Sequence, residues 1–174
     1  MTLSFQKAVA HDIPQIQRLA ESIWNACYPS MISKEQIRYM LSWMYTQTKL
    51  ETELERGVQY ELMLWEATAV GYLAWELSTD GNSVFLNKLY LDPKLHGLGL
   101  GQLALNRVLQ AARQAGAQTV ELRVNKGNAR ALRAYERAGF QIADAVVADI
   151  GGGFVMDDFI LRREVGPHAA PRGT

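Results

Sequence analysis

The chain contains little of several residue types that mark particular classes of protein. Among 174 residues there is one cysteine, Cys27, which excludes an internal disulfide and a cysteine-based zinc site. Lysine plus arginine and aspartate plus glutamate number 18 each, so the formal net charge is zero. Nucleic acids and anionic membranes select a basic surface. The balanced charge therefore disfavours both as the main partner.

The sequence also lacks long apolar runs. No window approaches the roughly 20 apolar residues that a membrane-spanning helix needs, and the start has no basic stretch followed by an apolar one. We therefore expect a cytoplasmic protein with no membrane partner. Because a domain takes roughly 100–200 residues, we expect one domain over residues 1–165. The small, polar tail over residues 166–174 is predicted to be disordered.

The sequence does contain an alternation of helical and extended patterns. A strand is predicted over residues 3–8, and apolar residues at helical spacing follow Asp12 and Ser33, two suitable helix caps. The remaining predicted helices cover residues 48–56, 100–115 and 128–138. The remaining predicted strands cover residues 58–66, 70–77, 83–91, 119–124, 140–147 and 154–163. This order predicts a mixed α/β domain of the α+β type, with helices against a mostly antiparallel sheet.

A glycine-rich segment, His96-Gly97-Leu98-Gly99-Leu100-Gly101, joins a predicted strand to a predicted helix. Glycine lets the backbone curl closely around a ligand, and amides at a helix N-terminus attract phosphate groups. A P-loop requires Gly-Lys-Ser/Thr, but Gln102 follows Gly101. A dinucleotide fingerprint would require glycine at this same position. The segment therefore indicates either an anion-binding loop of another kind or a flexible connection.

A second segment runs from Asn128 to Phe140 with the sequence Asn-Ala-Arg-Ala-Leu-Arg-Ala-Tyr-Glu-Arg-Ala-Gly-Phe. Asn128, Leu132 and Tyr135 share one face of the predicted helix. Taken alone, this pattern also fits a helix capped by Asn128 with Tyr135 packed in the core.

Together the two segments resemble the signatures of the GNAT superfamily of N-acetyltransferases. The pyrophosphate signature of that family, Arg/Gln-x-x-Gly-x-Gly/Ala, falls on His96 to Gly101, with His96 in place of Arg or Gln. The second signature, Asn-x-x-Ala-x-x-x-Tyr-x-x-x-Gly-Phe, is matched from Asn128 to Phe140. The resemblance covers residues 58–163. It implies a mixed, mostly antiparallel central sheet with splayed central strands, flanked by helices.

The resemblance implies acetyl-coenzyme A as the cofactor and direct acetyl transfer to an amine in a ternary complex. It implies that Tyr135 protonates the departing thiol, so Cys27 need not be a nucleophile and no metal is expected. Glu76, near a strand end, is our candidate for removing the amine proton, with a solvated carboxylate as the alternative. The implied cofactor contacts are Leu89, Tyr90, Leu91, His96, Gly97, Leu98, Gly99, Leu100, Gly101, Gln102, Asn128 and Tyr135.

The acceptor is less closely defined. Residues 28–29, 34–41 and 149–159 resemble the bacterial polyamine-acetylating branch, which implies a small primary amine. The candidate acceptor contacts are Trp24, Tyr28 and Trp43, and the region of the last two strands and their loop, with Asp149, Asp157 and Asp158, would suit a cation. Packing of the aromatic residues in the core is the alternative.

Other functions stay open at this point. Ribosomal-protein N-terminal acetyltransferases usually carry glutamate where this chain has Arg123, which disfavours that branch. Acetylation of a protein lysine or N-terminus remains possible, as does a non-catalytic domain that senses acyl-coenzyme A. The last two strands could support a homodimer.

Overall fold

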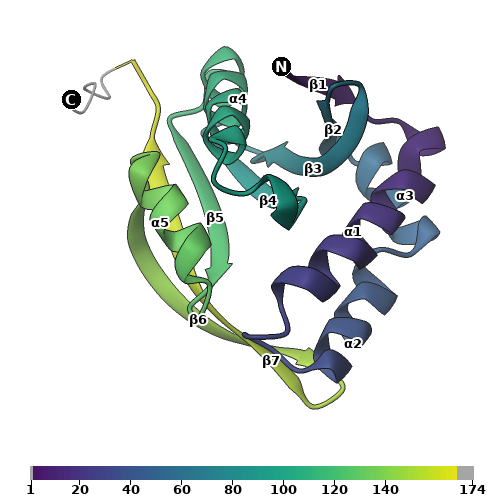
Figure 1. Cartoon of the computed structure of the whole chain (residues 1–174). Helices are drawn as coiled ribbons and strands as arrows, with labels where there is room; N and C mark the ends of the chain where they lie inside the picture. The colour runs from purple at the N-terminus through teal and green to yellow at the C-terminus, as the bar shows by residue number, and fades with distance from the viewer. Residues whose placement is uncertain (1, 168–174) are drawn as a thin grey trace. The chain divides into compact units, whose positions relative to one another are not determined.

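The helices and strands follow the predicted alternation, with most boundaries displaced by one or two residues. The computed structural model describes residues 2–167 (Figure 1). The α-helices are α1 (Ile13–Cys27), α2 (Lys34–Met44), α3 (Gln47–Glu55), α4 (Leu100–Gln114) and α5 (Ala129–Arg137). The strands are β1 (Leu3–Lys7), β2 (Gln59–Trp65), β3 (Thr68–Leu77), β4 (Ser83–Leu91), β5 (Thr119–Asn125), β6 (Gln141–Gly151) and β7 (Phe154–Glu164). Residues 168–174 of the tail predicted to be disordered lie outside the described residues.

Side-chain caps set the start of several helices. The Ser33 hydroxyl accepts a hydrogen bond from the Gln36 amide at 3.0 Å and so begins α2. Thr46 caps α3 in the same way. Asp12 was predicted to cap α1, but its side chain instead accepts from the Val9 amide at 2.9 Å. The carboxylate therefore stabilises the short 3₁₀ turn that precedes α1.

The seven strands lie in the order β1-β2-β3-β4-β5-β7-β6. The pairs β1–β2, β2–β3, β5–β7 and β6–β7 are antiparallel, whereas β4 and β5 are parallel. The register of β4 with β5 runs from the pair Ser83–Thr119 to the pair Leu86–Leu122. Both strands continue beyond these pairs, β4 to Leu91 and β5 to Asn125. The sheet is therefore mixed and mostly antiparallel, as predicted, and the ladder between its parallel strands is short.

The chain divides into two compact units, and the first contains residues 2–75 and 88–101. It carries β1, β2, most of β3 and the helices α1, α2 and α3, which contact one another (Figure 1). Its core is apolar and comes from both helices and strands; the largest fully buried aliphatic side chains include Ile13, Ile16, Ile37, Leu50, Leu62 and Leu73. This unit also contains the glycine-rich segment.

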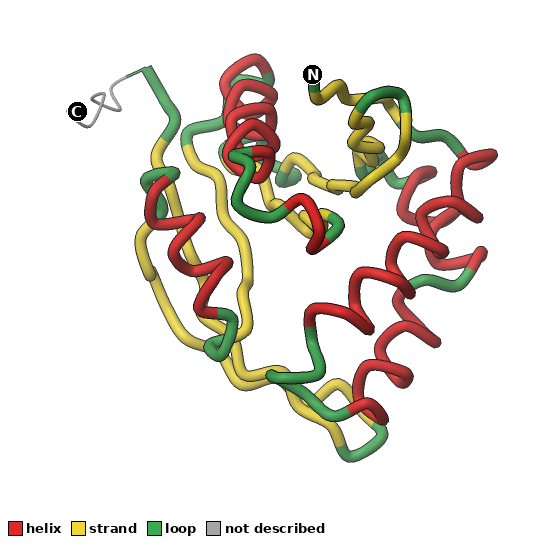
Figure 2. The backbone as a smooth tube through the Cα atoms, in the orientation of Figure 1, coloured by secondary structure: helices red, strands yellow, loops and turns green. Residues whose placement is uncertain are grey.

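The second unit contains residues 76–87 and 102–167 of the described chain. Leu105 and Leu109 of α4 are buried, as are Val120 and Leu122 of β5. The β6–β7 hairpin forms the long pair of strands in Figure 2. No helix in the described part of the chain is long and apolar enough to cross a membrane.

The β6–β7 hairpin corrects one prediction. Asp149 was expected in a loop, but it lies in β6. Asp157 and Asp158 lie in β7, within the strand predicted over residues 154–163. The turn is short because its three glycines, Gly151 to Gly153, all have positive φ, at 87°, 61° and 80°. β6 can therefore extend four residues further toward the turn than the predicted strand over residues 140–147.

Candidate functional site

The glycine-rich segment leaves β4 through a capped turn. The Asp92 carboxylate accepts from the Lys94 amide at 2.9 Å. Gly97 and Gly99 then adopt φ of 84° and 79°, the left-handed region that other residues avoid. Leu98 between them is 60 % exposed. Such a loop can expose its backbone amides to a ligand next to the N-terminus of a 15-residue helix.

His96, which departs from the family signature, contacts the end of the preceding strand. Its Nε2 atom lies 3.1 Å from the carbonyl oxygen of Leu91. Because a carbonyl only accepts hydrogen bonds, the ring donates from Nε2 in this contact. The side chain therefore fastens the start of the loop to the end of β4.

Gly71 of β3 packs against the strand segment that was predicted to bind the cofactor. A Cβ atom at Gly71 would lie 2.3 Å from the carbonyl oxygen of Tyr90 and 3.1 Å from the Cα of Leu91. Both neighbours are backbone atoms, so a side chain at Gly71 would displace β4 itself. The absence of a Cβ at this position therefore sets where the Tyr90–Leu91 backbone lies.

In the second unit, a side chain links α4 to α5. Gln102 Nε2 donates to the carbonyl oxygen of Ala134 at 2.9 Å. The next residue, Tyr135, is half-buried, and its ring lies edge-on to Phe140 with centroids 5.8 Å apart. Asn128 caps α5 by accepting from the Ala131 amide at 3.2 Å. The structure therefore brings Gln102 to the backbone beside Tyr135 and places Asn128 two turns before Tyr135 on the same helix.

Two of the predicted acceptor contacts lie together in the first unit. The Trp24 ring centroid is 4.9 Å from that of Tyr28 and 5.4 Å from that of Tyr90, and the Tyr28 and Tyr90 hydroxyl oxygens are 3.2 Å apart. Trp24 is buried. Trp43 instead lies on α2 beside Tyr39 and is 39 % exposed. Trp24, Tyr28, Tyr45, Tyr72 and Tyr90 are named the aromatic cluster below.

Sequence reasoning missed Tyr45 and Tyr72, which complete the aromatic cluster. Their hydroxyl oxygens lie 2.7 Å apart, and the two rings meet edge-on. Burial raises the pKa of Tyr72 far above its ordinary value. Burial, and then the neighbouring Tyr72, raises the pKa of Tyr45 in the same direction. Both phenols therefore stay protonated near neutral pH and cannot act as bases.

Sequence reasoning also missed a buried ion pair in the first unit. Lys88 of β4 is 6 % exposed, and its Nζ lies 3.4 Å from Glu53 Oε2. The ammonium also lies 5.6 Å and 5.3 Å from the ring centroids of Tyr45 and Tyr60. The Tyr60 hydroxyl donates to the same Glu53 oxygen. This cation is therefore fully enclosed by an opposite charge and aromatic faces.

The predicted acidic groups differ in environment. Glu76 is half-buried near the end of β3, in the second unit. Asp149 and Asp157 are exposed, whereas Asp158 is 2 % exposed. Asp158 Oδ1 has no hydrogen-bond partner in the part of the chain that the structure describes. Burial raises the pKa of Asp158, and the nearby charge of Arg123 acts in the opposite direction.

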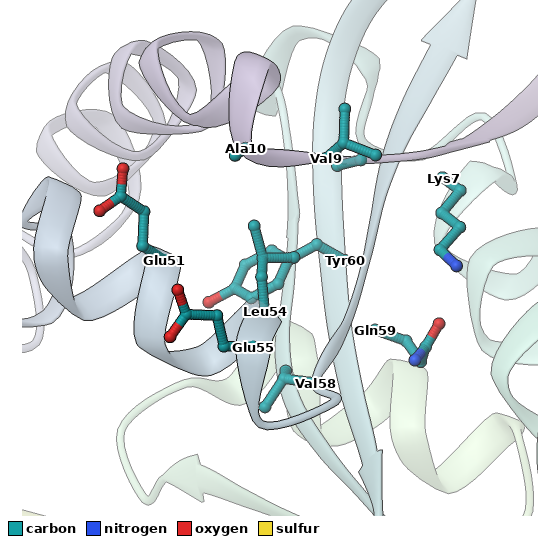
Figure 3. Close-up of a pocket in the computed structure, with 10 residues that line it drawn as sticks. Lys7, Val9, Ala10, Glu51, Leu54, Glu55, Val58, Gln59 and Tyr60 are labelled. Atoms are coloured by element: carbon teal, nitrogen blue, oxygen red, sulfur yellow. The ribbon is translucent and has the colours of Figure 1, made fainter.

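A separate surface pocket of about 590 Å³ lies in the first unit (Figure 3). Glu51 and Glu55 of α3 border it together with Tyr60 of β2. Its lining is mixed in character and includes no residue predicted to bind cofactor or acceptor; the lining residues are Lys7, Ala8, Val9, Ala10, Glu51, Leu54, Glu55, Val58, Gln59 and Tyr60. Within residues 2–167, no group of three or more histidine, cysteine, aspartate or glutamate side chains is placed to hold a metal ion.

Comparison with known proteins connects this geometry to a family. The profile of the acetyltransferase (GNAT) family matches residues 18–140. An uncharacterised N-acetyltransferase of Mycobacterium tuberculosis is 38 % identical over 96 residues, which are 55 % of this chain and 60 % of that protein. The chain thus matches less than two thirds of the length of this curated relative.

Two solved structures share the fold. PaiA N-acetyltransferase from Thermoplasma acidophilum, in complex with coenzyme A, has a TM-score of 0.81 and 21 % identity over 94 % of this chain and 99 % of that one. The ribosomal-protein-S18-alanine N-acetyltransferase from Escherichia coli has a TM-score of 0.72 and 14 % identity over 99 % of each chain. At these identities the likeness concerns the fold alone.

Proposed function

Since this chain belongs to the acetyltransferase (GNAT) family, we propose that it transfers the acetyl group of acetyl-coenzyme A directly to a primary amine. The observation that carries this proposal is the glycine loop in front of α4. Its left-handed glycines and exposed Leu98 suit backbone binding of a pyrophosphate. The coenzyme A bound to PaiA N-acetyltransferase, which shares the fold, supports the same cofactor.

In this proposal, the cofactor is held mainly by main-chain groups. The end of β4, from Leu89 through Tyr90 to Leu91, binds the pantetheine arm, and an amide near Leu89 polarises the thioester carbonyl. The pyrophosphate lies on the amides of the segment from Gly97 to Gln102, with His96 fastening that segment to β4. Asn128 contacts the cofactor from the start of α5. Within that segment, the proposed contacts to the pyrophosphate include Leu98, Gly99, Leu100 and Gly101.

Tyr135 is the proposed proton donor to the departing thiol. An ordinary phenol has a pKa of about 10 and a thiol about 8.5, so complete transfer is uphill by about 2 kcal/mol. The phenol therefore first donates a hydrogen bond to the developing charge on sulfur and completes the transfer late. Its place on α5 beside the Gln102–Ala134 hydrogen bond supports a fixed position for this group.

We propose a small cationic amine, such as a polyamine, as the acceptor. Tyr28 supports this choice as a half-buried aromatic ring, and the buried Trp24 packs against it. Trp43 stays a proposed acceptor contact at an exposed position of α2. Glu76 stays a candidate for removing the amine proton. We propose a cytoplasmic location for the reaction.

Two alternatives differ from this proposal in a measurable way. The first alternative is a protein acceptor, because the fold is shared with the ribosomal-protein-S18-alanine N-acetyltransferase. A non-catalytic sensor would bind acyl-coenzyme A without turnover. Assays of polyamine and peptide acceptors side by side distinguish a small-amine acetyltransferase from a protein acetyltransferase. Amine-dependent turnover distinguishes an enzyme from a sensor.

The test is release of free thiol from acetyl-coenzyme A with a panel of monoamines, polyamines and short peptides. We expect amine-dependent release, reduced in Tyr135→Phe by up to about 10²–10⁴-fold because general acid catalysis is lost. Cofactor affinity measured by calorimetry should be unchanged in that variant. Cofactor binding without release from any acceptor would favour the sensor, and no cofactor binding would exclude the proposed role of the loop.

A homodimer through the β6–β7 hairpin completes the proposal. Ile142, Val147 and Val155 are exposed apolar side chains of this hairpin. Their partners in the register place all three on one face of the hairpin. Exposed apolar residues on one face suit self-association. Light scattering of the wild type and Val147→Asp would show a dimer that the substitution disrupts.

A further inference from the structure

The second unit contains a buried carboxylate that no structural contact explains. Asp158 lies on β7, the middle strand of the β5–β7–β6 group, opposite Asn125 of β5 and Val146 of β6. It is 2 % exposed, and its Oδ1 has no hydrogen-bond partner within residues 2–167. Buried polar atoms in native proteins are normally satisfied, so an unsatisfied carboxylate oxygen points to a ligand, an ordered water or a proton.

The backbone around Asp158 leads directly to the proposed site. Asn125 is the last residue of β5, and its carbonyl oxygen accepts from the Asn128 amide at 2.9 Å. Asn128 in turn caps α5, the helix that carries Tyr135. The carboxylate therefore lies across one strand pair from the start of the segment that binds cofactor in the proposed function.

The neighbouring charged groups leave Asp158 without a dedicated counter-ion. Lys126, in the turn after β5, is bound to the exposed Asp157 at 2.7 Å, and its ammonium lies over the Phe159 ring. Arg123 of β5 is exposed and pairs in register with Ile160. On β6 the residue opposite Asp158 is the apolar Val146. A cationic ligand would supply the missing partner.

We propose that Asp158 binds the ammonium of the acceptor amine and accepts its proton. This inference rests on the proposed function. The N–H bond of the ammonium breaks, the proton passes to the Asp158 carboxylate, and the electron pair stays on the amine nitrogen. That nitrogen forms the C–N bond to the acetyl carbon, and the C–S bond breaks. The second amine proton ends on the thiol through Tyr135, and Asp158 returns its proton to solvent.

Burial suits Asp158 to this role. A carboxyl group with a raised pKa is a stronger base once ionised than an ordinary surface carboxylate. The charged groups that act on it are Arg123 and Lys126, which lower its pKa, and Asp157, which raises it. The acidic limb of the pH–rate profile should therefore follow the protonation of the Asp158 carboxyl.

The test compares Asp158→Asn with Asp157→Asn, a matched change at the adjacent exposed carboxylate. Thiol release is followed against pH with spermidine and butylamine as acceptors. Asp158→Asn should lower kcat/KM for the amine by about 10²–10⁴-fold and abolish the acidic limb. Its Kd for acetyl-coenzyme A should be unchanged. Asp157→Asn should keep the limb but move it to lower pH, because Asp157 raises the pKa of Asp158, and Asp158→Glu should restore part of the rate.

Several outcomes would overturn the proposal. One is an unchanged acidic limb in Asp158→Asn, which would leave the residue a merely structural role. Another is loss of that limb in Glu76→Gln instead. If the wild type turns over no amine, the proposed function fails separately. Calorimetry with spermidine in the presence of coenzyme A then decides on Asp158: binding lost in Asp158→Asn supports a cation site, and no binding by the wild type excludes it.

Discussion

Two buried charged side chains, Lys88 in the first unit and Asp158 in the second, have opposite surroundings. Lys88 is held by Glu53 and by the ring faces of Tyr45 and Tyr60. Asp158 has an oxygen without a partner in the described chain. Because an unpaired buried charge is costly, folding stability alone would favour the first arrangement over the second. The difference separates a group that holds the fold together from one that is available to a ligand.

The largest effect is expected where the buried charge is paired. Lys88→Met leaves the Glu53 carboxylate without its counter-ion, so we expect the free energy of unfolding to fall by about 3–5 kcal/mol. Urea denaturation at neutral pH measures the change. Adding Glu53→Gln should recover part of the loss. A single variant as stable as the wild type would show that the pair contributes nothing.

Gly71→Ala tests how closely the backbone of β3 packs against that of β4 at Tyr90 and Leu91. The new Cβ would contact the Tyr90 carbonyl, so β4 must move at a cost of about 1–3 kcal/mol. Because the Tyr90–Leu91 segment is proposed to bind the pantetheine arm, the Kd for coenzyme A should also rise. Gly81→Ala, at a turn glycine with φ of 74°, is the control that destabilises without affecting binding. Equal Kd values for the two variants would contradict the prediction.

Asp158→Asn should produce a smaller change of the opposite sign. Burial raises the folded-state pKa of this carboxyl, so its favourable contribution is complete only below the ordinary aspartate pKa of about 3.9. That contribution is lost as pH rises through the higher folded-state value. We therefore expect the variant to have a modestly higher Tm than the wild type at pH 7, with the difference shrinking toward pH 4. A lower Tm at pH 7 would indicate a structural role for the carboxylate.

The smallest effect is expected at the exposed neighbour of Asp158. Asp157 and Lys126 form an ion pair with side chains 54 % and 35 % exposed. Lys126→Met should therefore change the free energy of unfolding by less than about 1 kcal/mol. Because Lys126 lowers the pKa of Asp158, the acidic limb of the activity profile should move to higher pH. A loss of stability as large as that of Lys88→Met would contradict the prediction that the buried ion pair of the first unit contributes more than the exposed pair of the second.

The elements of the fold could be predicted because their signals are local. Ser33 and its amide partner are three residues apart, and the two family signatures each fill a short stretch of chain. Asp12 occupies the predicted N-cap position of α1, but its carboxylate binds the Val9 amide before the helix and not an amide of the helix itself. The loop expected around Asp149 was wrong because three left-handed glycines allow a tight turn, so strand pairing continues beyond the apolar pattern.

The environments of single side chains could not be predicted, because they depend on distant residues. Lys88 lies 35 positions from Glu53, and the Tyr45 hydroxyl meets that of Tyr72 across 27 positions. Asp158 and Asp157 are adjacent in sequence, yet one is buried and the other exposed. Only the strand alternation separates them, and the sequence does not say which face is covered. The placement of Trp24, Tyr28, Trp43, Glu76 and Tyr135 in a site stays a prediction.

The hydrogen bond from Gln102 to Ala134 has an electrostatic consequence for the empty and loaded states. It joins the first turn of α4, a partial positive charge, to the last turn of α5, a partial negative charge. An arriving pyrophosphate would neutralise the first of these charges and weaken their mutual attraction. The neutral amide of Gln102 keeps its bond whatever charge the ligand brings. The helix that carries Tyr135 is therefore joined to α4 by a contact that does not depend on a charged side chain.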